Sequence, residues 1–166
     1  MPLSTSASTE ISISKINSTE GSTCPAGNVT LSATATLGGT INWYDDFGNF
    51  LDTGNTYTTP SLTSTTTYYA EESVGLCRIP VIATVYTIPT ITSTTYATIC
   101  GAGTATLTAT ASAGTINWYD NLGIWKKEGN SFTSPTINTT TTYYVEATEN
   151  GCTSAREPAT INVQYT

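Results

Sequence analysis

The chain has 166 residues, a net charge of −7 and no histidine. With only five Lys and Arg residues it lacks the basic surface that nucleic-acid binding requires, and without histidine it lacks the commonest general base and metal ligand. No run of about 18 apolar residues occurs, so no segment is expected to insert into a membrane.

The residue types favour β-structure. Threonine and serine, 38 and 16 residues, make up about a third of the chain, and ten Tyr and three Trp residues supply large side chains to bury. Thr, Tyr, Val and Ile are all strand formers. Because no stretch shows apolar residues at helical spacing, we expect an all-β protein.

The first half of the chain contains short predicted strands separated by turn residues. Residues 29–35 alternate apolar and hydroxyl side chains, which is typical of a half-buried antiparallel strand. Ile41 and Trp43 share one face of the next strand, and residues 45–48 (Asp-Asp-Phe-Gly) predict a hairpin turn. The last strand of this half is predicted over 81–86.

The second half repeats the first. Residues 115–120 (Thr-Ile-Asn-Trp-Tyr-Asp) repeat 40–45, and residues 140–144 (Thr-Thr-Thr-Tyr-Tyr) repeat 65–69. The matching elements are a strand over 105–111, an apolar face of Ile116 and Trp118, a hairpin turn at 120–123, a strand over 143–148, a tight turn at 149–151 and a final strand over 159–163. About seven short strands per unit, with turns at regular intervals, predict an antiparallel sandwich for each repeat.

The junction between the repeats is short. We place the first repeat at 1–87 and the second at 88–166, with a single proline, Pro89, near the junction and no Gly/Ser-rich spacer. A short linker that contains proline has little hinge freedom, so the sequence predicts a semi-rigid, rod-like tandem pair.

The repeated pattern resembles a known family. The Ile-Asn-Trp-Tyr-Asp motif at 41–45 and 116–120, the Thr-Thr-Thr-Tyr-Tyr run and the Gly151-Cys152 pair resemble immunoglobulin-like repeats of large secreted and surface proteins of Bacteroidetes. Many of these proteins are exported by the type IX system, and some are gliding or attachment adhesins. The resemblance implies two tandem Ig-like sandwiches with an extracellular, cell-surface location, and it implies no catalytic residues.

The four cysteines follow the repeat. Cys24 lies 53 residues before Cys77, and Cys100 lies 52 residues before Cys152. Three pairings are possible, and the shared spacing favours bonds within each repeat, Cys24–Cys77 and Cys100–Cys152, which would clip loops at one end of each sandwich. A metal site or redox pair is the weaker alternative, because no Cys-x-x-Cys motif and no histidine are present.

Acidic residues around the first hairpin form a weak calcium candidate. Asp45, Asp46 and Asp52 offer the oxygen ligands that calcium prefers. The second repeat replaces Asp46 with Asn121 and Asp52 with Lys127, so turn formation and a solvated edge explain these residues better. No cofactor is expected.

Three aromatic residues form a candidate contact site for a ligand. Trp125, with Phe50 at the matching position, follows a hairpin glycine in an otherwise polar strand. Tyr119 and Tyr144 are expected to point away from the core because their neighbours point into it. Such rings stack on sugars or partner proteins, and the ordinary alternative is that they cover the sheet edge.

These observations favour a non-enzymatic stalk or spacer segment of a large bacterial cell-surface adhesin, which extends and presents other domains. The alternative is a ligand- or carbohydrate-binding module that uses the exposed aromatic residues, and an enzyme is a remote third. The expected partners are neighbouring repeats of the same polypeptide, with surface glycans or another surface protein as further candidates. We expect the chain to be monomeric.

Overall fold

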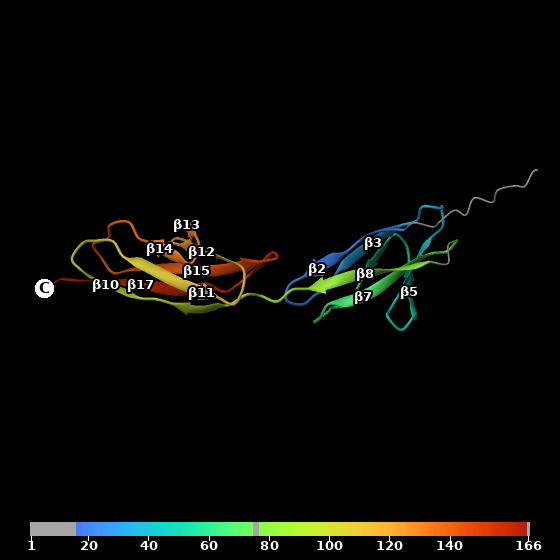
Figure 1. The fold of residues 1–166 in the computed structure, drawn as a ribbon, viewed down its shortest axis with the longest axis horizontal. Coiled ribbons are helices and arrows are strands. Elements are labelled where there is room, and N and C mark those ends of the chain that lie inside the picture. The colour runs from blue at the N-terminus through green and yellow to red at the C-terminus, as the bar shows by residue number, and fades with distance from the viewer. Residues whose placement is uncertain (1–15, 75–76, 166) are drawn as a thin grey trace, which may run out of the picture. The chain divides into compact units, whose positions relative to one another are not determined.

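The computed structural model describes residues 16–74 and 77–165, which form two compact units, unit 1 ending at Val85 and unit 2 beginning at Tyr86 (Figure 1). Within these ranges every regular element is a strand, so the all-β prediction is confirmed. No helix that could span a membrane is found in the described part of the chain.

Two sheets make up unit 1. The smaller has the order β1 (Asn17–Thr19), β3 (Thr30–Thr34) and β6 (Thr56–Thr58). The larger has the order β2 (Gly21–Thr23), β8 (Arg78–Val85), β7 (Thr66–Glu72), β4 (Ile41–Tyr44) and β5 (Phe50–Thr53). Neighbouring strands are antiparallel except for β2 and β8, which are parallel.

Unit 2 repeats this topology. Its smaller sheet has the order β9 (Ile91–Thr94), β11 (Thr106–Ala111) and β14 (Ser131–Thr133). Its larger sheet has the order β10 (Ala97–Cys100), β17 (Glu157–Gln164), β15 (Thr141–Glu149), β12 (Thr115–Tyr119) and β13 (Trp125–Glu128), and β16 (Cys152–Thr153) pairs with β15. Among the described strands of unit 2, again only one pair, β10 with β17, is parallel.

A tryptophan anchors the core of each unit. Trp118 on β12 is fully buried, stacks on Phe132 at a ring-centre distance of 5.8 Å, and donates its indole N–H to the Gly129 carbonyl at 2.8 Å. Trp43 of unit 1 is equally buried and stacks on Tyr57 at 5.9 Å. The alternating Ala and Leu side chains of β3 and β11 line the same cores, as the period-two pattern predicts.

The predicted hairpin turns are also present. The Gly48 N–H donates to the Asp45 carbonyl at 3.1 Å, and Gly123 donates to Asp120 at 3.0 Å. Each glycine has a positive φ, which a residue with a side chain adopts only with strain. Because the same turn chemistry occurs in both units, local sequence determines where β4 and β12 end.

Unit 1 contains a buried carboxylate on β7. Glu72 is 1% exposed, and its Oε1 accepts hydrogen bonds from the backbone N–H groups of Leu37 at 2.8 Å and Gly39 at 3.1 Å. The matching residue of unit 2 is Ala147, which is also buried. Glu72 thus fixes the loop that contains Leu37 and Gly39 in unit 1, and unit 2 forms the matching loop without a carboxylate. There Gly114, at φ +79°, packs so closely on the β15 backbone that a side chain would overlap the Thr148 carbonyl.

The structure does not form the predicted Cys24–Cys77 bond. Cys24 directly follows β2, whose last residue, Thr23, is paired with Val85 at the end of β8. Cys77 directly precedes the other end of β8, at Arg78. The eight residues of β8 span about 23 Å, whereas the Cα atoms of a disulfide lie about 4.4–6.8 Å apart. The two cysteines lie at opposite ends of unit 1.

The predicted Cys100–Cys152 bond fails for the same reason. Cys100 is paired with Gln164 at the end of β17. Cys152 is paired with Glu149 of β15, and Glu149 lies past the other end of β17, because the first residue of β17, Glu157, is already paired with Val145. The prediction assumed that both cysteines of a repeat lie at one end of its sandwich. The parallel pairing of β2 with β8, and of β10 with β17, places them at opposite ends instead.

Candidate functional site

The outer face of the larger sheet carries the candidate contact residues. Tyr119 on β12 lies directly opposite Tyr144 on β15, and both are half-buried. Their chain neighbours Trp118, Tyr143 and Val145 are buried, so alternation turns the two tyrosines to the outer face.

An arginine completes this face in unit 2. The guanidinium carbon of Arg156 lies 3.8 Å from the centre of the Tyr119 ring, a cation–π contact. Arg156 Nε donates to Glu146 Oε2 at 2.7 Å, and the Tyr119 hydroxyl donates to Glu146 Oε1 at 2.6 Å. We call these three residues the outer triad of unit 2.

The contacts of the triad shift the pKa values of Tyr119 and Arg156. The hydrogen bond to Glu146 raises the pKa of Tyr119, because ionisation of the phenol would place two negative charges side by side. The same carboxylate raises the pKa of Arg156. Tyr119 is therefore a neutral donor at physiological pH.

Unit 1 builds an equivalent triad from Tyr44, Glu71 and Arg78. The Arg78 guanidinium carbon lies 3.7 Å from the Tyr44 ring centre, and its Nη2 lies 2.9 Å from Glu71 Oε2. Phe50 meets the Tyr44 ring edge-on at a centre distance of 5.9 Å. The cation–π contact and the ion pair thus recur in both repeats, which argues for a structural role.

Trp125 is the most prominent aromatic residue beside the unit 2 triad. It lies on β13 opposite Tyr119, is 56% exposed, and donates its indole N–H to Asn117 Oδ1 at 3.2 Å. Phe50, its counterpart, is 59% exposed but has no polar group to orient a ligand. The exposed indole and its hydrogen bond to Asn117 distinguish unit 2 from unit 1 on this face.

Sequence reasoning missed both arginines and both glutamates of the triads. Glu146 alternates with two buried neighbours on β15, which is a signal that it faces outward. Arg156 lies just before β17, outside any regular pattern, and only the fold brings it to Tyr119. The recurrence of a Glu and a later Arg in both repeats was the available clue.

The calcium candidate does not come together. Asp45 Oδ1 accepts hydrogen bonds from the backbone of Phe47 at 3.0 Å and Asn49 at 2.8 Å, and the Asn49 side chain is the largest cause of its lowered pKa. Asp52 Oδ1 accepts from the Thr53 backbone. Among the residues that the structure describes, no three acidic or cysteine side chains are grouped so that they could hold a metal ion, and Asp46 joins no such group.

The matching aspartate of unit 2 also serves its hairpin. Asp120 Oδ1 accepts from the backbone N–H groups of Leu122 and Ile124, both at 2.9 Å, and Oδ2 forms an ion pair with Lys126 at 2.7 Å. The bond to Lys126 is the main cause of the lowered pKa of Asp120. Both aspartates are therefore explained by turn structure.

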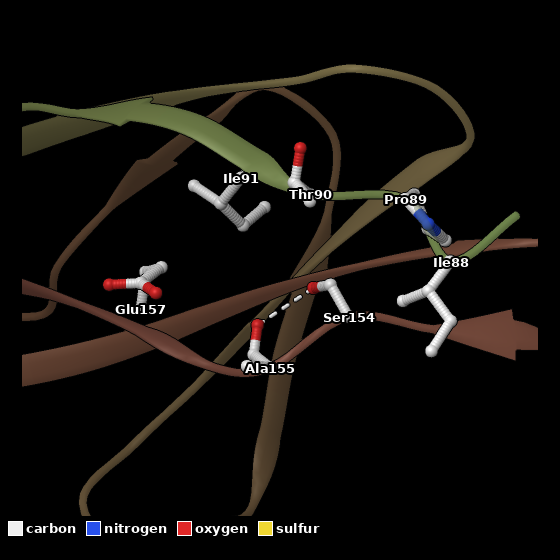
Figure 2. A pocket seen from close by; sticks show the side chains of 7 residues that line it. All are labelled: Ile88, Pro89, Thr90, Ile91, Ser154, Ala155 and Glu157. Carbon is white, nitrogen blue, oxygen red and sulfur yellow. Dashed lines mark hydrogen bonds between the residues drawn. The ribbon is translucent and has the colours of Figure 1, made fainter. Parts of the chain in front are cut away.

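Unit 2 also contains a hollow of about 350 Å³ (Figure 2). Its lining residues are Ile88, Pro89, Thr90, Ile91, Ser154, Ala155 and Glu157. The Ser154 hydroxyl donates to the Ala155 carbonyl at 2.7 Å and accepts from the Ala147 N–H at 2.9 Å, so it is committed to the backbone. Among these seven residues no base lies beside the serine, and the hollow has no arrangement for nucleophilic chemistry.

Comparison with known proteins gives one family. The model described as "Ig-like domain CHU_C associated" matches residues 12–86 and again 87–164. No curated protein matches the chain.

A solved structure of titin domains supports the fold. The I-band fragment I67–I69 from titin is 14% identical, with 92% of this chain and 65% of that chain covered and a TM-score of 0.53. Sidekick-1 immunoglobulin domains 1–4 are 12% identical, with 92% and 48% covered and a TM-score of 0.49. At this identity the titin fragment shows a shared tandem Ig-like architecture and nothing about ligands.

Proposed function

The chain belongs to the CHU_C-associated Ig-like domain family and carries two such domains in tandem, and from this we propose that it is a stalk or spacer segment of a large bacterial cell-surface adhesin. In this role it extends the parent protein and presents other domains, without catalysing a reaction. Tandem Ig-like domains are typically structural or adhesion modules, and Ig-like domains with disulfide-bonded cysteines fit an extracellular protein.

The duplicated construction supports the proposal best. Each unit has its own core around one tryptophan and its own outer triad. Side chains that could have been reactive form structural hydrogen bonds instead: Asp45 and Asp120 accept them from backbone N–H groups of their hairpins, and Ser154 donates one to a backbone carbonyl. A spacer requires this kind of self-contained, repeated unit, whereas an active site would distinguish one copy from the other.

Small-angle X-ray scattering of the whole chain tests the spacer role. A single compact globule of this length has a radius of gyration of about 15 Å, whereas two small domains held apart give a value above ~20 Å. We expect the larger value, unchanged by salt, because a spacer must hold its domains apart. A value near 15 Å would overturn the proposal.

The second candidate function is carbohydrate binding by unit 2. Trp125 is the observation that favours it, because its exposed ring lies on the same face as Tyr119 and Tyr144. A glycan array with the native chain and a Trp125→Ala variant tests it, with Phe50→Ala as the matched control. Binding that Trp125→Ala abolishes and Phe50→Ala leaves intact supports the candidate, and an array without hits removes it.

A further inference from the structure

The cysteines of this chain are of two kinds, defined by their places in the fold. Cys100 is the last residue, and Cys24 the next residue after the end, of the short strand that pairs in parallel with the last strand of the unit, and we call them strand-end cysteines. Cys77 and Cys152 each lie between the last two long strands, and we call them turn cysteines. Each repeat carries one of each kind.

The two kinds cannot meet inside a unit. A strand of eight residues separates them in both units, and this length is several times the span of a disulfide. A bond between a strand-end cysteine and a turn cysteine therefore has to join two different repeats.

Two of the four cysteines are disulfide-bonded and two are free, and each pair contains one cysteine of each kind. Cys24 and Cys152, one of each kind, are disulfide-bonded. Cys100 and Cys77, the remaining one of each kind, are exposed free thiols. The two thiols left over are thus complementary in kind, and each is equivalent by the repeat to a cysteine that does form a bond.

We propose that Cys100 and Cys77 are covalent attachment points for further repeats of the same construction, Cys100 bonding the turn cysteine and Cys77 the strand-end cysteine of another repeat. The inference goes beyond the spacer role, because it identifies a partner and the atoms that bind it. A second copy of this chain supplies both complementary cysteines.

The bond forms by thiol–disulfide exchange with a small disulfide oxidant such as oxidised glutathione. The Cys100 thiolate attacks one sulfur of the oxidant, which gives a mixed disulfide and releases one glutathione thiolate. The Cys77 thiolate of a second copy then attacks the Cys100 sulfur and releases the second glutathione. Two cysteine thiols together lose two electrons and two protons, and the oxidant is reduced to two thiols.

Two single variants provide the test. Cys77→Ser keeps only the Cys100 thiol, and Cys100→Ser keeps only the Cys77 thiol. Each is incubated alone and mixed with the other, one of them isotope-labelled, in a glutathione redox buffer. Products are resolved by non-reducing electrophoresis and peptide mapping, and maleimide labelling measures access to each thiol. The double variant is the control and stays monomeric.

We expect the mixture to give mainly the hybrid dimer linked from Cys100 to Cys77, each single variant alone to remain largely monomeric, and the native chain to form a covalent ladder. Random pairing of equally reactive thiols would instead give about half hybrid dimers, and single variants that dimerise this readily would overturn the proposal. So would an uncrosslinked mixture, or mapping that finds Cys24–Cys77 and Cys100–Cys152 in the native chain. These readouts are independent of the scattering that tests the spacer role.

Discussion

Replacing Trp118 with alanine should strongly destabilise unit 2 while leaving unit 1 intact. The indole is fully buried, stacks on Phe132 and donates a 2.8 Å hydrogen bond to Gly129. Truncation of a buried tryptophan costs about 3–5 kcal/mol. Because Gly129 is only half-buried, water can replace the lost donor, and the hydrogen bond adds little to that cost.

The size of this loss relative to the stability of the unit makes the test decisive. A domain of about 80 residues has an unfolding free energy of roughly 4–12 kcal/mol, so Trp118→Ala removes about a quarter of it or more. At a denaturant slope of about 1–2 kcal/mol per molar urea, the midpoint of unit 2 falls by about 1.5 M or more. Trp125→Ala, a change of the same type at a side chain 56% exposed, should cost less than about 1 kcal/mol.

Hydrogen-exchange mass spectrometry across a urea series is the appropriate assay, because peptides report on each unit separately and tryptophan fluorescence is not needed. Trp43→Ala serves as the matched control and should destabilise unit 1 alone. Equal losses for Trp118→Ala and Trp125→Ala would refute the assignment of faces. A loss spread equally over both units would refute the independence of the two cores.

The remaining predictions concern a buried carboxylate, a tight turn and an ion pair. Glu72→Ala should lower the unfolding free energy of unit 1 by about 1–3 kcal/mol, since two backbone N–H groups lose their acceptor, and Glu72→Gln should cost less in the same urea series. Gly114→Ala should lower the melting temperature of unit 2 clearly more than Gly101→Ala, because both have positive φ but only Gly114 packs against backbone. Asp120→Asn should make unit 2 less sensitive to acid: Lys126 lowers the pKa of Asp120, so its contribution is present above the ordinary value of 3.8 and is lost as pH falls through the folded-state value. Acid titrations of the two proteins that coincide would contradict the last expectation.

Features encoded over a few neighbouring residues could be predicted from the sequence. Alternation placed Trp43 and Trp118 in the cores, and the turn residues ended their strands where the structure ends them. Both depend on the two-residue period of a strand and on glycine at positive φ, which are local properties of the chain.

Features that depend on strand order could not be predicted in the same way. The cysteine spacing repeats faithfully, yet spacing does not tell whether β2 runs parallel or antiparallel to the last strand, and that direction decides which end of the unit Cys24 occupies. The triads were missed for a related reason, because Arg78 and Arg156 reach tyrosines that are remote in sequence. Glu72 occupies a buried position that its residue type alone argues against.

The parallel pairing of β2 with β8 also determines how unit 1 responds to tension. A pull on the two ends of unit 1 passes through β1, reaches β2 at its first residue and leaves β8 from its last, so β2 and β8 are drawn in opposite directions along their length. The hydrogen bonds of the pair, evenly spaced as in any parallel ladder, are then loaded together in shear. An antiparallel terminal pair pulled from one edge would open like a zipper, one bond at a time. Because β10 and β17 are arranged in the same way, both units meet a stretching force with this parallel pair in the stronger geometry.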